Sequence, residues 1–360
     1  LFARRLPEVF AESTALRSQA YTLTGGPGGA PEVIEPGVQG ADAYGWRPQY
    51  GLTRNSGVGS VAIGADLPSP GGPTFVQGTE AWKMYVSVQR LPHVGLLTGQ
   101  NSLYISAYEF EGLVKMAVED IINAMNPDLF AGASGGNNLV GINNLIIATG
   151  TRHGLDVGTY PSLANKVYAN SGTPRTITVA ILDAALHDFL GTYDRVPWPA
   201  DWIGVTDYVT FEDLTQITTG GATRYFVVSD NEGVPNILST TGIRWKGIPI
   251  VPMGGATAGR IDVFRQGCLR RFAVGGRLPA NLANEALQSA ASGGQIAPVP
   301  NGEMRGEVGA VSNAGFHVLP PQWAGQNLNI IVATYQGMKC GGRDLPPNKC
   351  AFSIQDLQTS

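Results

Sequence analysis

The stretch from Trp82 to Asn126 constrains the fold most, because it has the pattern of a strand, a short connection and a long amphipathic helix. Ser106 and Glu109 form a capping-box pattern, and Asn126 precedes Pro127, which disfavours helical backbone at Asn126. We predict a helix over residues 106–126, roughly 30 Å long at about 1.5 Å per residue. Taken alone, it indicates a core helix of an α/β domain. Apolar residues at three- and four-residue steps would form its buried stripe: Phe110, Leu113, Val114, Ala117, Val118, Ile121, Ile122 and Met125.

The residues before this helix predict a long β-excursion. Trp82, Met84, Val86 and Val88 occupy alternate positions, as in a strand with one covered face. Upstream, the chain is rich in glycine and contains a turn cluster at 68–73. We predict that residues 44–91 form an extended β-hairpin loop. A hairpin of this size is marginal alone in water and needs a surface to lie on, which no nearby segment supplies.

Residues 1–43 are predicted to form an N-terminal arm. A short amphipathic helix is expected within residues 1–20, followed by a break at 24–31 and extended chain to Asp42. The arm has too little apolar content for a core, so it either stays disordered or lies across another surface. The sequence begins without a methionine, which fits either processing or numbering that starts partway along.

The rest of the chain mixes strands and helices without regular alternation, which indicates the α+β class. A second helix is predicted from Thr176 to Leu190, and a short one from Asn281 to Ser289. A last strand is expected to end at Ile354. Further strands are predicted at Trp202–Val205, Arg224–Val228, Gly242–Val251, Arg260–Phe264 and Asn327–Thr334.

Composition indicates a folded protein with little surface charge. Hydrophobic residues make up 43% of the chain and charged residues only 14%, against about 25% in typical globular proteins. A chain with 48 glycines and 24 prolines favours irregular or β structure, and its low charge favours surface covered by association. The net charge is −4, and no basic tract of the kind that grips nucleic acid is present. No apolar run has the length of a membrane span or of a signal-peptide core.

No residues with the spacing of a catalytic, cofactor or metal site are found, so we predict that the chain is not an enzyme and binds no cofactor. The glycine-rich stretch 57–64 lacks the Gly-Lys-Ser/Thr ending of a phosphate loop, and there is no Gly-x-Ser-x-Gly elbow. The four histidines are scattered, and the acidic residues on the long helix are expected to form a solvated face. A catalytic pair drawn from distant segments stays an alternative.

The three cysteines do not make a disulfide scaffold. Cys340 and Cys350 flank a loop that permits a local disulfide, although cysteines in such positions are more often free. Cys268 has no partner nearby in sequence and is predicted to be a small buried apolar residue. Zinc is not expected, because no further ligand lies at the required spacing.

The order of these pieces resembles the major capsid protein of tailed bacteriophages, with its Hong Kong 97-like fold. The strand at Trp82–Gln89 leads through Tyr104-Ile-Ser106 into the long helix. Gly242–Val251 resembles the family's strand with a Gly-x-Pro core, and Pro347–Phe352 resembles its closing Pro-x-Ala-Phe segment, here lengthened. Nearly the whole chain is covered, although each motif is short. The resemblance implies a spine helix at 106–126, an N-terminal arm at 1–43, an extended loop at 44–91, a peripheral domain at 92–130 and 266–360, and an axial domain at 131–265.

The resemblance also implies a function. The chain would self-assemble into hexamers and pentamers of an icosahedral phage head that encloses double-stranded DNA without sequence-specific binding. Its expected location is the virion shell, after assembly in the host cytoplasm and without a membrane. Scaffold, portal and cement proteins are further expected partners. The alternatives are an encapsulin-type nanocompartment shell, a β-rich binding protein, or an enzyme with a dispersed site; the long arm and large loop favour the phage shell.

One departure from the family concerns covalent crosslinks. Some members join a lysine of the extended loop to an asparagine of a neighbouring subunit. Here Lys83 is the only lysine in the predicted loop, and it lies at the stalk rather than the tip. We therefore predict no such crosslink. Interwoven arms, a cement protein or cysteine pairing would have to reinforce the shell instead. The family's N-terminal scaffold segment is absent, which fits either processing or a separate scaffold protein.

Overall fold

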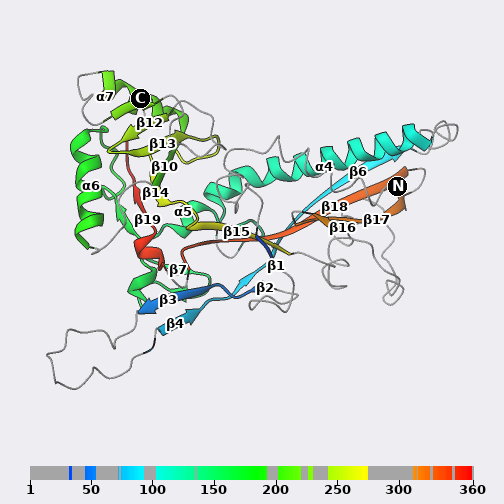
Figure 1. Ribbon diagram of the computed structural model, residues 1–360, viewed down its shortest axis with the longest axis horizontal. Coiled ribbons are helices and arrows are strands. Elements are labelled where there is room, and N and C mark those ends of the chain that lie inside the picture. Colours follow the sequence, from blue (N-terminus) through cyan, green and yellow to red (C-terminus); the bar gives the residue numbers. More distant parts are fainter. Residues whose placement is uncertain are drawn as a thin grey trace, which may run out of the picture.

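A computed structural model gives the fold of the chain. It describes residues 32–34, 45–53, 72, 74–92, 103–133, 136–192, 202–219, 226–229, 242–274, 311–313, 315–324, 327–342 and 345–358. The helices predicted within 1–20 and at Asn281–Ser289 lie outside these residues. Helices and sheets are mixed, which confirms the predicted α+β class. One long helix lies along a sheet of long strands, and a second sheet with two shorter helices lies at the other end of the molecule (Figure 1).

The first sheet has six strands in the order β1-β15-β18-β17-β16, with β6 paired to β18. β6 and β18 run antiparallel from Asn327 opposite Pro92 to Gln336 opposite Lys83. The predicted strand at Asn327–Thr334 is therefore confirmed and is longer than expected. The strands are β1 (Glu32–Ile34), β6 (Lys83–Pro92), β15 (Leu269–Val274), β16 (Val311–Asn313), β17 (Phe316–Ala324) and β18 (Asn327–Cys340).

The predicted long helix is confirmed as α4, which spans Leu103–Ala131. Both predicted ends are wrong: Ser106 lies inside the helix rather than at its cap, and the helix continues through Pro127. Pro127 is exposed, whereas Leu129 and Phe130 are 0% and 1% exposed in the core. Burial of these two side chains outweighs the local preference of the residue before proline, because packing supplies most helix stability in a folded protein.

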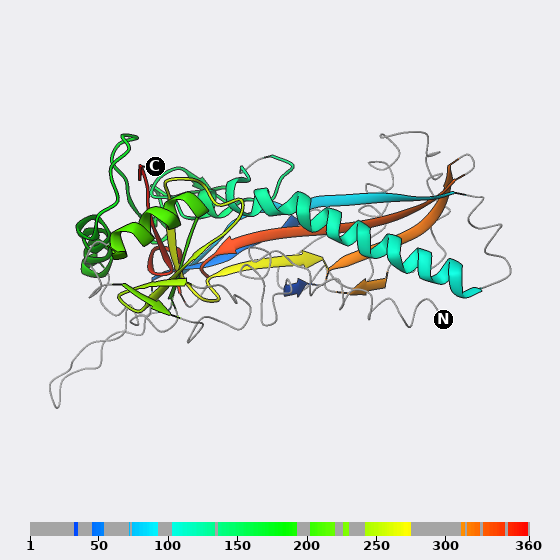
Figure 2. The same cartoon turned by 90° about the horizontal axis from the view of Figure 1, so that it is seen from above.

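The length of α4 matches the sheet beneath it. A helix of 29 residues is about 44 Å long, and a strand of 14 residues is about 46 Å long. Figure 2 shows α4 crossing β6 and β18 at an angle and separating from them toward its N-terminal end. The predicted apolar stripe is buried from Val114 to Met125, and Leu113 is partly buried against it. The side chain of Phe110 lies outside the described residues.

The prediction of one covered face on the strand before α4 is wrong. The Tyr85 hydroxyl donates to Asp128 Oδ2 at 2.7 Å, and Gln89 Nε2 donates to Asp120 Oδ2 at 2.7 Å. The face that carries Tyr85 and Gln89 therefore meets α4, and Met84, Val86 and Val88 point to the opposite face. Residues 84–89 are partly buried on both faces. Alternation in sequence could not reveal this, because the polar tips of Tyr85 and Gln89 find partners on the helix.

The second sheet has seven strands in the order β11-β12-β13-β10-β14-β19-β9. The pairs β10–β13 and β19–β9 are parallel, and the other neighbours are antiparallel. The predicted last strand is confirmed as β19, but it joins this sheet rather than the first. The strands are β9 (Lys166–Tyr168), β10 (Trp202–Thr206), β11 (Phe226–Ser229), β12 (Gly242–Trp245), β13 (Ile248–Pro252), β14 (Ile261–Arg265) and β19 (Ala351–Ile354).

Both faces of this sheet are buried, which explains why β10, β13 and β19 are buried at every position. One face packs against α6 (Val179–Thr192), where the Phe189 and Phe352 rings lie 4.8 Å apart. Val251 and Phe264 instead belong to the core cluster that contains α4. The predicted second helix is thus confirmed, and α7 (Tyr208–Thr219) was not predicted.

The segment predicted as one strand at Gly242–Val251 is two strands, β12 and β13. Lys246 and Gly247 join them with φ angles of 48° and 85°, which is the left-handed pair that a tight hairpin turn requires. The Gly-Ile-Pro motif therefore begins β13 rather than continuing a single strand.

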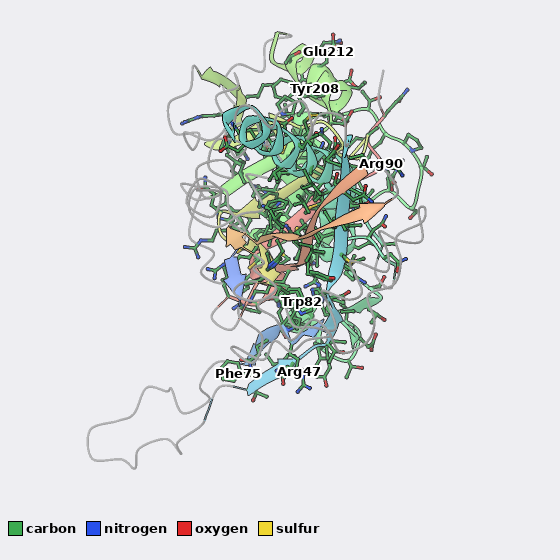
Figure 3. The ribbon with its side chains drawn as sticks, turned by 90° about the vertical axis from the view of Figure 1, so that its right-hand side faces the viewer. Arg47, Phe75, Trp82, Arg90, Tyr208 and Glu212 are labelled. Atoms are coloured by element: carbon green, nitrogen blue, oxygen red, sulfur yellow. The ribbon has the colours of Figure 1, made fainter. Side chains whose placement is uncertain are left out.

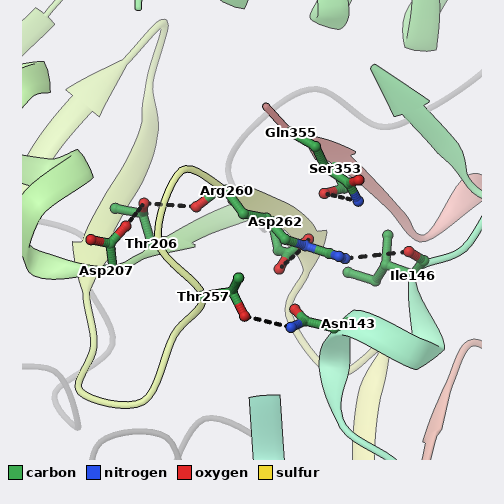
Figure 4. Close-up of polar contacts among 9 residues, drawn as sticks. All are labelled: Asn143, Ile146, Thr206, Asp207, Thr257, Arg260, Asp262, Ser353 and Gln355. Atoms are coloured by element: carbon green, nitrogen blue, oxygen red, sulfur yellow. Dashed lines mark hydrogen bonds and ion pairs between the residues drawn. The ribbon is translucent and has the colours of Figure 1, made fainter. Parts of the chain in front are cut away.

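Short polar links hold the seven-stranded sheet to the end of the long helix. Arg260 Nε donates to both oxygens of Asp262 at 2.8 and 2.9 Å, and its Nη2 donates to the Ile146 carbonyl at 3.3 Å (Figure 4). Ile146 directly follows α5 (Ile142–Leu145), which contacts α4. Asn143 of α5 donates to Thr257 Oγ1 at 2.5 Å. Side-chain hydrogen bonds, as well as the shared core, therefore join the seven-stranded sheet to α5 and, through it, to the end of α4.

The predicted domain boundaries stay a prediction. Sheet membership differs from them at one point, because β19 lies within 266–360 yet belongs to the same sheet as the strands of 131–265. In the part of the chain that is described, no helix is both long and apolar enough to cross a membrane.

Candidate functional site

The root of the excursion, formed by residues 45–53 and 74–83, combines packed aromatic rings with buried charged side chains. β2 (Gly45–Trp46) pairs with β5 (Glu80–Ala81), and β3 (Gln49–Thr53) pairs with β4 (Thr74–Gln77). These pairs confirm a two-stranded excursion at its base. Residues 54–71, where its tip is predicted, lie outside the described residues.

Aromatic rings seat the excursion on the body. Trp46 is 4% exposed, and its ring lies 6.2 Å from that of Trp82 and 5.0 Å from that of Phe272 in β15. The His153 ring lies 5.5 Å from Trp46 and 6.1 Å from Tyr50. His153 belongs to the turn between β7 (Thr151–Arg152) and β8 (Leu155–Asp156). Four separate segments of the chain thus meet around one tryptophan.

A buried ion-pair network lies beside these rings. Glu80 Oε1 lies 3.2 Å from Lys83 Nζ, and Glu80 Oε2 lies 3.1 Å from His153 Nδ1. Lys83 Nζ also donates to the Gly136 carbonyl at 2.6 Å, just beyond the end of α4. The side chains of Lys83, Glu80 and His153 are 7%, 9% and 0% exposed. Such a network is sensitive to the loss of any one member, because the others would be left charged in a dry site.

Burial and neighbouring charges shift the titration of this network. Burial lowers the pKa of His153, and the nearby Arg152 guanidinium lowers it further, against the opposing effect of the Glu80 carboxylate. Burial opposes ionisation of Glu80, but its hydrogen bond to His153 and the Lys83 ammonium hold its pKa below the usual range. The ion pair at neutral pH is therefore between Glu80 and Lys83.

Backbone contacts fix the excursion in place as well. The Thr79 amide donates to the His153 carbonyl at 3.0 Å, and the Gly51 amide donates to the Gly342 carbonyl at 3.2 Å. A Cβ atom at Gly78 would lie 2.6 Å from the His153 carbonyl oxygen, so this position admits only glycine without movement. The root is thus held by β7–β8 on one side and by the end of β18 on the other.

A second buried hub lies behind Tyr50. The Arg152 guanidinium donates to the Leu145 carbonyl and to Asn165 Oδ1. Asn165 Nδ2 donates in turn to the carbonyls of Pro347 and Ala351, at 2.7 and 3.0 Å. Pro347 begins the short helix η5 (Pro347–Lys349), which leads into β19. This hub joins the segment below the excursion to the strand that closes the seven-stranded sheet.

The outer surface of the excursion remains open. Phe75 in β4 is 40% exposed, and Arg47 between β2 and β3 is also exposed. Figure 3 shows Phe75 and Arg47 on one side of the molecule, and Tyr208 and Glu212 of α7 on the opposite side. Tyr208 and Val209 are 60% and 42% exposed. Both sides therefore present apolar side chains to solvent.

The described residues contain no group of three or more His, Cys, Asp or Glu side chains placed to hold a metal ion. The predicted absence of catalytic and cofactor residues stays a prediction. Cys268, Cys340 and Cys350 are all buried and all free, so the local disulfide is not formed and the predicted burial of Cys268 is confirmed. His317 is buried and bonds the Val274 carbonyl, whereas His187 is exposed on α6.

Sequence reasoning identified Lys83 but not its partners. Glu80 and His153 are 73 residues apart, and no spacing rule connects them. The sequence did indicate that Trp46 and Tyr50 are buried. Both are large aromatic residues at even spacing, which places them on one face of a strand, and the segment around them is otherwise poor in apolar residues.

Comparison with known proteins adds the last observation. No model of a protein family matches the sequence, and no curated protein matches it. The capsid subunit of cyanophage A-1(L) superposes with a TM-score of 0.60 at 13% identity, covering 90% of each chain. The capsid of a native GTA particle superposes with a TM-score of 0.53 at 12% identity, covering 95% of this chain and 92% of the other. The capsid of an empty GTA particle gives 0.52 at 11% identity, covering 95% and 91%. At these identities the similarity establishes the fold, and the chain therefore has the fold of a phage major capsid protein.

Proposed function

We propose that the chain is the major capsid protein of a tailed bacteriophage, which self-assembles into hexamers and pentamers of an icosahedral head around double-stranded DNA. The observation that carries the proposal is the fold shared with the cyanophage capsid subunit over nine-tenths of both chains. Low charge, at 14% of residues, supports a surface that is largely covered by other subunits.

The excursion gives this proposal a physical basis. Its inner face packs on the body through Tyr50, which is 0% exposed beside Val157 and Leu163. Its outer face leaves Phe75 40% exposed. Two strands with one open face bury too little surface to be stable alone. A neighbouring subunit would supply the missing surface, and residues 54–71 would extend over it.

The same proposal assigns a role to each segment of the chain. Residues 1–43 act as an arm and 44–91 as the extended loop. The peripheral domain comprises 92–130 and 266–360, and the axial domain comprises 131–265, whose sheet β19 of the peripheral range joins. Shell contacts run through the arm and the loop. Scaffold, portal and cement proteins are the expected further partners, and the location is the virion after assembly in the host cytoplasm.

The packaged DNA is enclosed rather than recognised. The chain has 24 basic and 28 acidic residues, and its net charge of −4 offers no sequence-independent grip on phosphate. We expect particles to retain DNA by closure of the shell, so purified unassembled subunits should not shift a DNA fragment in a gel at physiological salt.

The environment of Lys83 supports the absence of a covalent crosslink. Its side chain is 7% exposed, and its ammonium already contacts Glu80 and the Gly136 carbonyl. An isopeptide bond would need a neutral, accessible amine. Boiled particles should therefore run as single subunits on a denaturing gel. A peptide linking Lys83 to an asparagine, found by mass spectrometry, would contradict this.

The experiment that tests the function is expression of the chain followed by size-exclusion chromatography and negative-stain microscopy. Closed shells or capsomer rings are the expected result, and a stable monomer would overturn the proposal. Deletion of residues 55–73, replaced by a short turn, should leave a folded subunit that does not form shells. Normal shells from this deletion would refute the role of the loop.

The nanocompartment alternative makes a different prediction for native particles. A phage head should contain double-stranded DNA that resists added nuclease until the shell is opened. A nanocompartment should contain a co-purifying protein cargo and no such DNA. Genes for a portal and a terminase beside this one would also favour the phage head.

A further inference from the structure

The three cysteines, far apart in sequence, meet in one place. Cys268 precedes β15, Cys340 ends β18, and Cys350 lies between η5 and β19. Backbone hydrogen bonds hold these segments together. The Gly341 amide donates to the Cys268 carbonyl at 2.9 Å, the Cys268 amide donates to the Arg265 carbonyl at 3.0 Å, and the Arg265 amide donates to the Cys350 carbonyl at 2.9 Å.

Cys350 is the central member of this cluster. Its thiol is close enough to those of Cys268 and Cys340 to influence their ionisation. Its Sγ also lies 3.5 Å from the Leu345 carbonyl oxygen. Cys268, Cys340 and Cys350 are 6%, 0% and 0% exposed and belong to the core that contains α4. Two different disulfides could therefore form at Cys350.

A surface pocket of about 520 Å³ favours the Cys268–Cys350 disulfide over the Cys340–Cys350 disulfide. Cys268 and Cys350 line it, together with the cationic side chains of Arg265, Arg270 and Lys339, and Cys340 is not among its lining residues. A small solute in this pocket can therefore reach Cys268 and Cys350. Among the described residues that line the pocket, the charged side chains are those of Arg265, Arg270 and Lys339, and positive charge favours a thiolate at its wall.

We propose that this pocket is a thiol-oxidation site, at which a peroxide converts Cys268 and Cys350 into a disulfide while Cys340 relays one proton. The Cys268 thiol loses its proton, its sulfur attacks one peroxide oxygen and the O–O bond breaks. Cys268 becomes a sulfenic acid, and the proton it lost converts the departing hydroxide to water. The Cys350 sulfur then attacks the Cys268 sulfur and breaks the S–O bond, and the Cys350 proton passes through Cys340 to the departing oxygen, which leaves as a second water. Two thiols are oxidised and one peroxide is reduced to two waters.

The roles of Cys350 and Cys340 follow from their surroundings. Burial raises the pKa of Cys350, and its thiol contacts with Cys268 and Cys340 raise it further. The hydrogen bond from Cys350 lowers the pKa of Cys340 against the effect of burial, and the charge of Arg152 assists. Cys350 thus keeps its proton until it reacts, and Cys340 is the group placed to take it.

The bond would join the two sheets. Cys268 leads directly into β15 of the six-stranded sheet, and Cys350 leads directly into β19 of the seven-stranded sheet. A link between residues 268 and 350 closes a long loop and restricts the unfolded chain more than a link between 340 and 350. The inference does not depend on the shell function, since it concerns a single subunit.

Trypsin separates the three cysteines, which makes the test direct. Cleavage after Arg265 and Arg270 gives the peptide 266–270, cleavage after Lys339 and Arg343 gives 340–343, and cleavage after Lys349 gives a peptide that begins at Cys350. The purified chain is treated with hydrogen peroxide, alkylated and digested without reductant. The expected product is peptide 266–270 joined to the peptide of Cys350, with 340–343 alkylated, and dithiothreitol should release both.

Variants separate the roles. Cys350→Ser should abolish the link and leave a Cys268 sulfenic acid that dimedone traps. Cys340→Ser should give the same link about tenfold or more slowly, as loss of a proton acceptor predicts; an unchanged rate would remove Cys340 from the proposal. Peroxide treatment that leaves both Cys268 and Cys350 alkylatable, or that joins Cys340 to Cys350, would overturn it. The wild-type result decides the pairing even if a variant fails to fold.

Discussion

The indole ring of Trp46 lies directly against the backbone of Gly337, so that a Cβ atom at position 337 would overlap the ring. Gly337 is in β18, opposite Phe272 of β15. Trp46 belongs to β2, at the root of the excursion. Because Gly337 has no side chain, the Trp46 ring can pack directly on the central strand of the six-stranded sheet, and this contact holds the excursion against the body.

Replacing Gly337 with alanine should weaken this seat. The added methyl group must displace Trp46, which also packs on Trp82 and Phe272, and overpacking of this kind costs about 1–3 kcal/mol. Urea unfolding measures the change in the free energy of unfolding. Gly342→Ala is the matched control, because a Cβ atom there meets nothing within 4 Å and its φ is not positive. Equal stability of the two variants would contradict the role of Gly337.

Acidification should destabilise the chain through His153. Its pKa is lowered from 6.5 in the folded state, so the unfolded chain binds more protons and stability falls as the pH drops below 6.5. His317, also buried with a lowered pKa, contributes in the same direction. Melting temperatures between pH 7.5 and about pH 5 should decline, and His153→Gln should reduce the slope. His187→Gln, on an exposed site, should leave the slope unchanged, and a similar reduction in this control would contradict the assignment.

A charge in the buried stripe of α4 should unfold the subunit. Ile121 is 2% exposed in the main core, and an aspartate there would be buried without a partner. Ile121→Asp should lower the free energy of unfolding by roughly 4 kcal/mol. Met116→Asp tests the same helix at a position that is 53% exposed, and it should change stability little. Far-UV circular dichroism during urea unfolding compares the two, and a folded Ile121→Asp variant of normal stability would count against the packing described.

The start of α7 depends on Asp207. Its Oδ2 accepts hydrogen bonds from the amides of Val209 and Thr210, at 3.0 and 3.1 Å, which are two of the free donors at a helix N-terminus. Asp207→Ala should cost about 1 kcal/mol of stability. Asp207→Asn keeps an accepting oxygen and should cost less. Loss of equal size in both variants would show that charge, rather than capping, is the important property.

The sequence predicted the long helix well but not its ends. The stripe from Val114 to Met125 depends on periodicity, which a sequence displays directly. Continuation through Pro127 depends on Leu129 and Phe130 reaching a core built from β10, β13 and β14. That core consists of residues distant in sequence, so a rule about the residue before proline could not anticipate it.

The root of the excursion was the least predictable part. Glu80, Lys83 and His153 have no common motif, and their proximity depends on how β7 and β8 fold back below β5. Helix α7 was missed for a different reason. The sequence contains a capping residue, Asp207, and an apolar residue, Leu214, which is buried in the helix. However, many of its twelve residues are threonine or other β-branched residues, which have low helix propensity, so the segment was equally compatible with irregular chain.

The pairing of β6 with β18 has a mechanical consequence. The excursion enters the body through β6, which lies antiparallel to β18 from Lys83 to Pro92. Antiparallel hydrogen bonds lie perpendicular to the strands, so a pull on the excursion along the strand direction loads all of them in shear at once instead of peeling them one by one. In the proposed shell, tension between subunits that is delivered through the excursion would be spread over Asn327–Gln336 of β18.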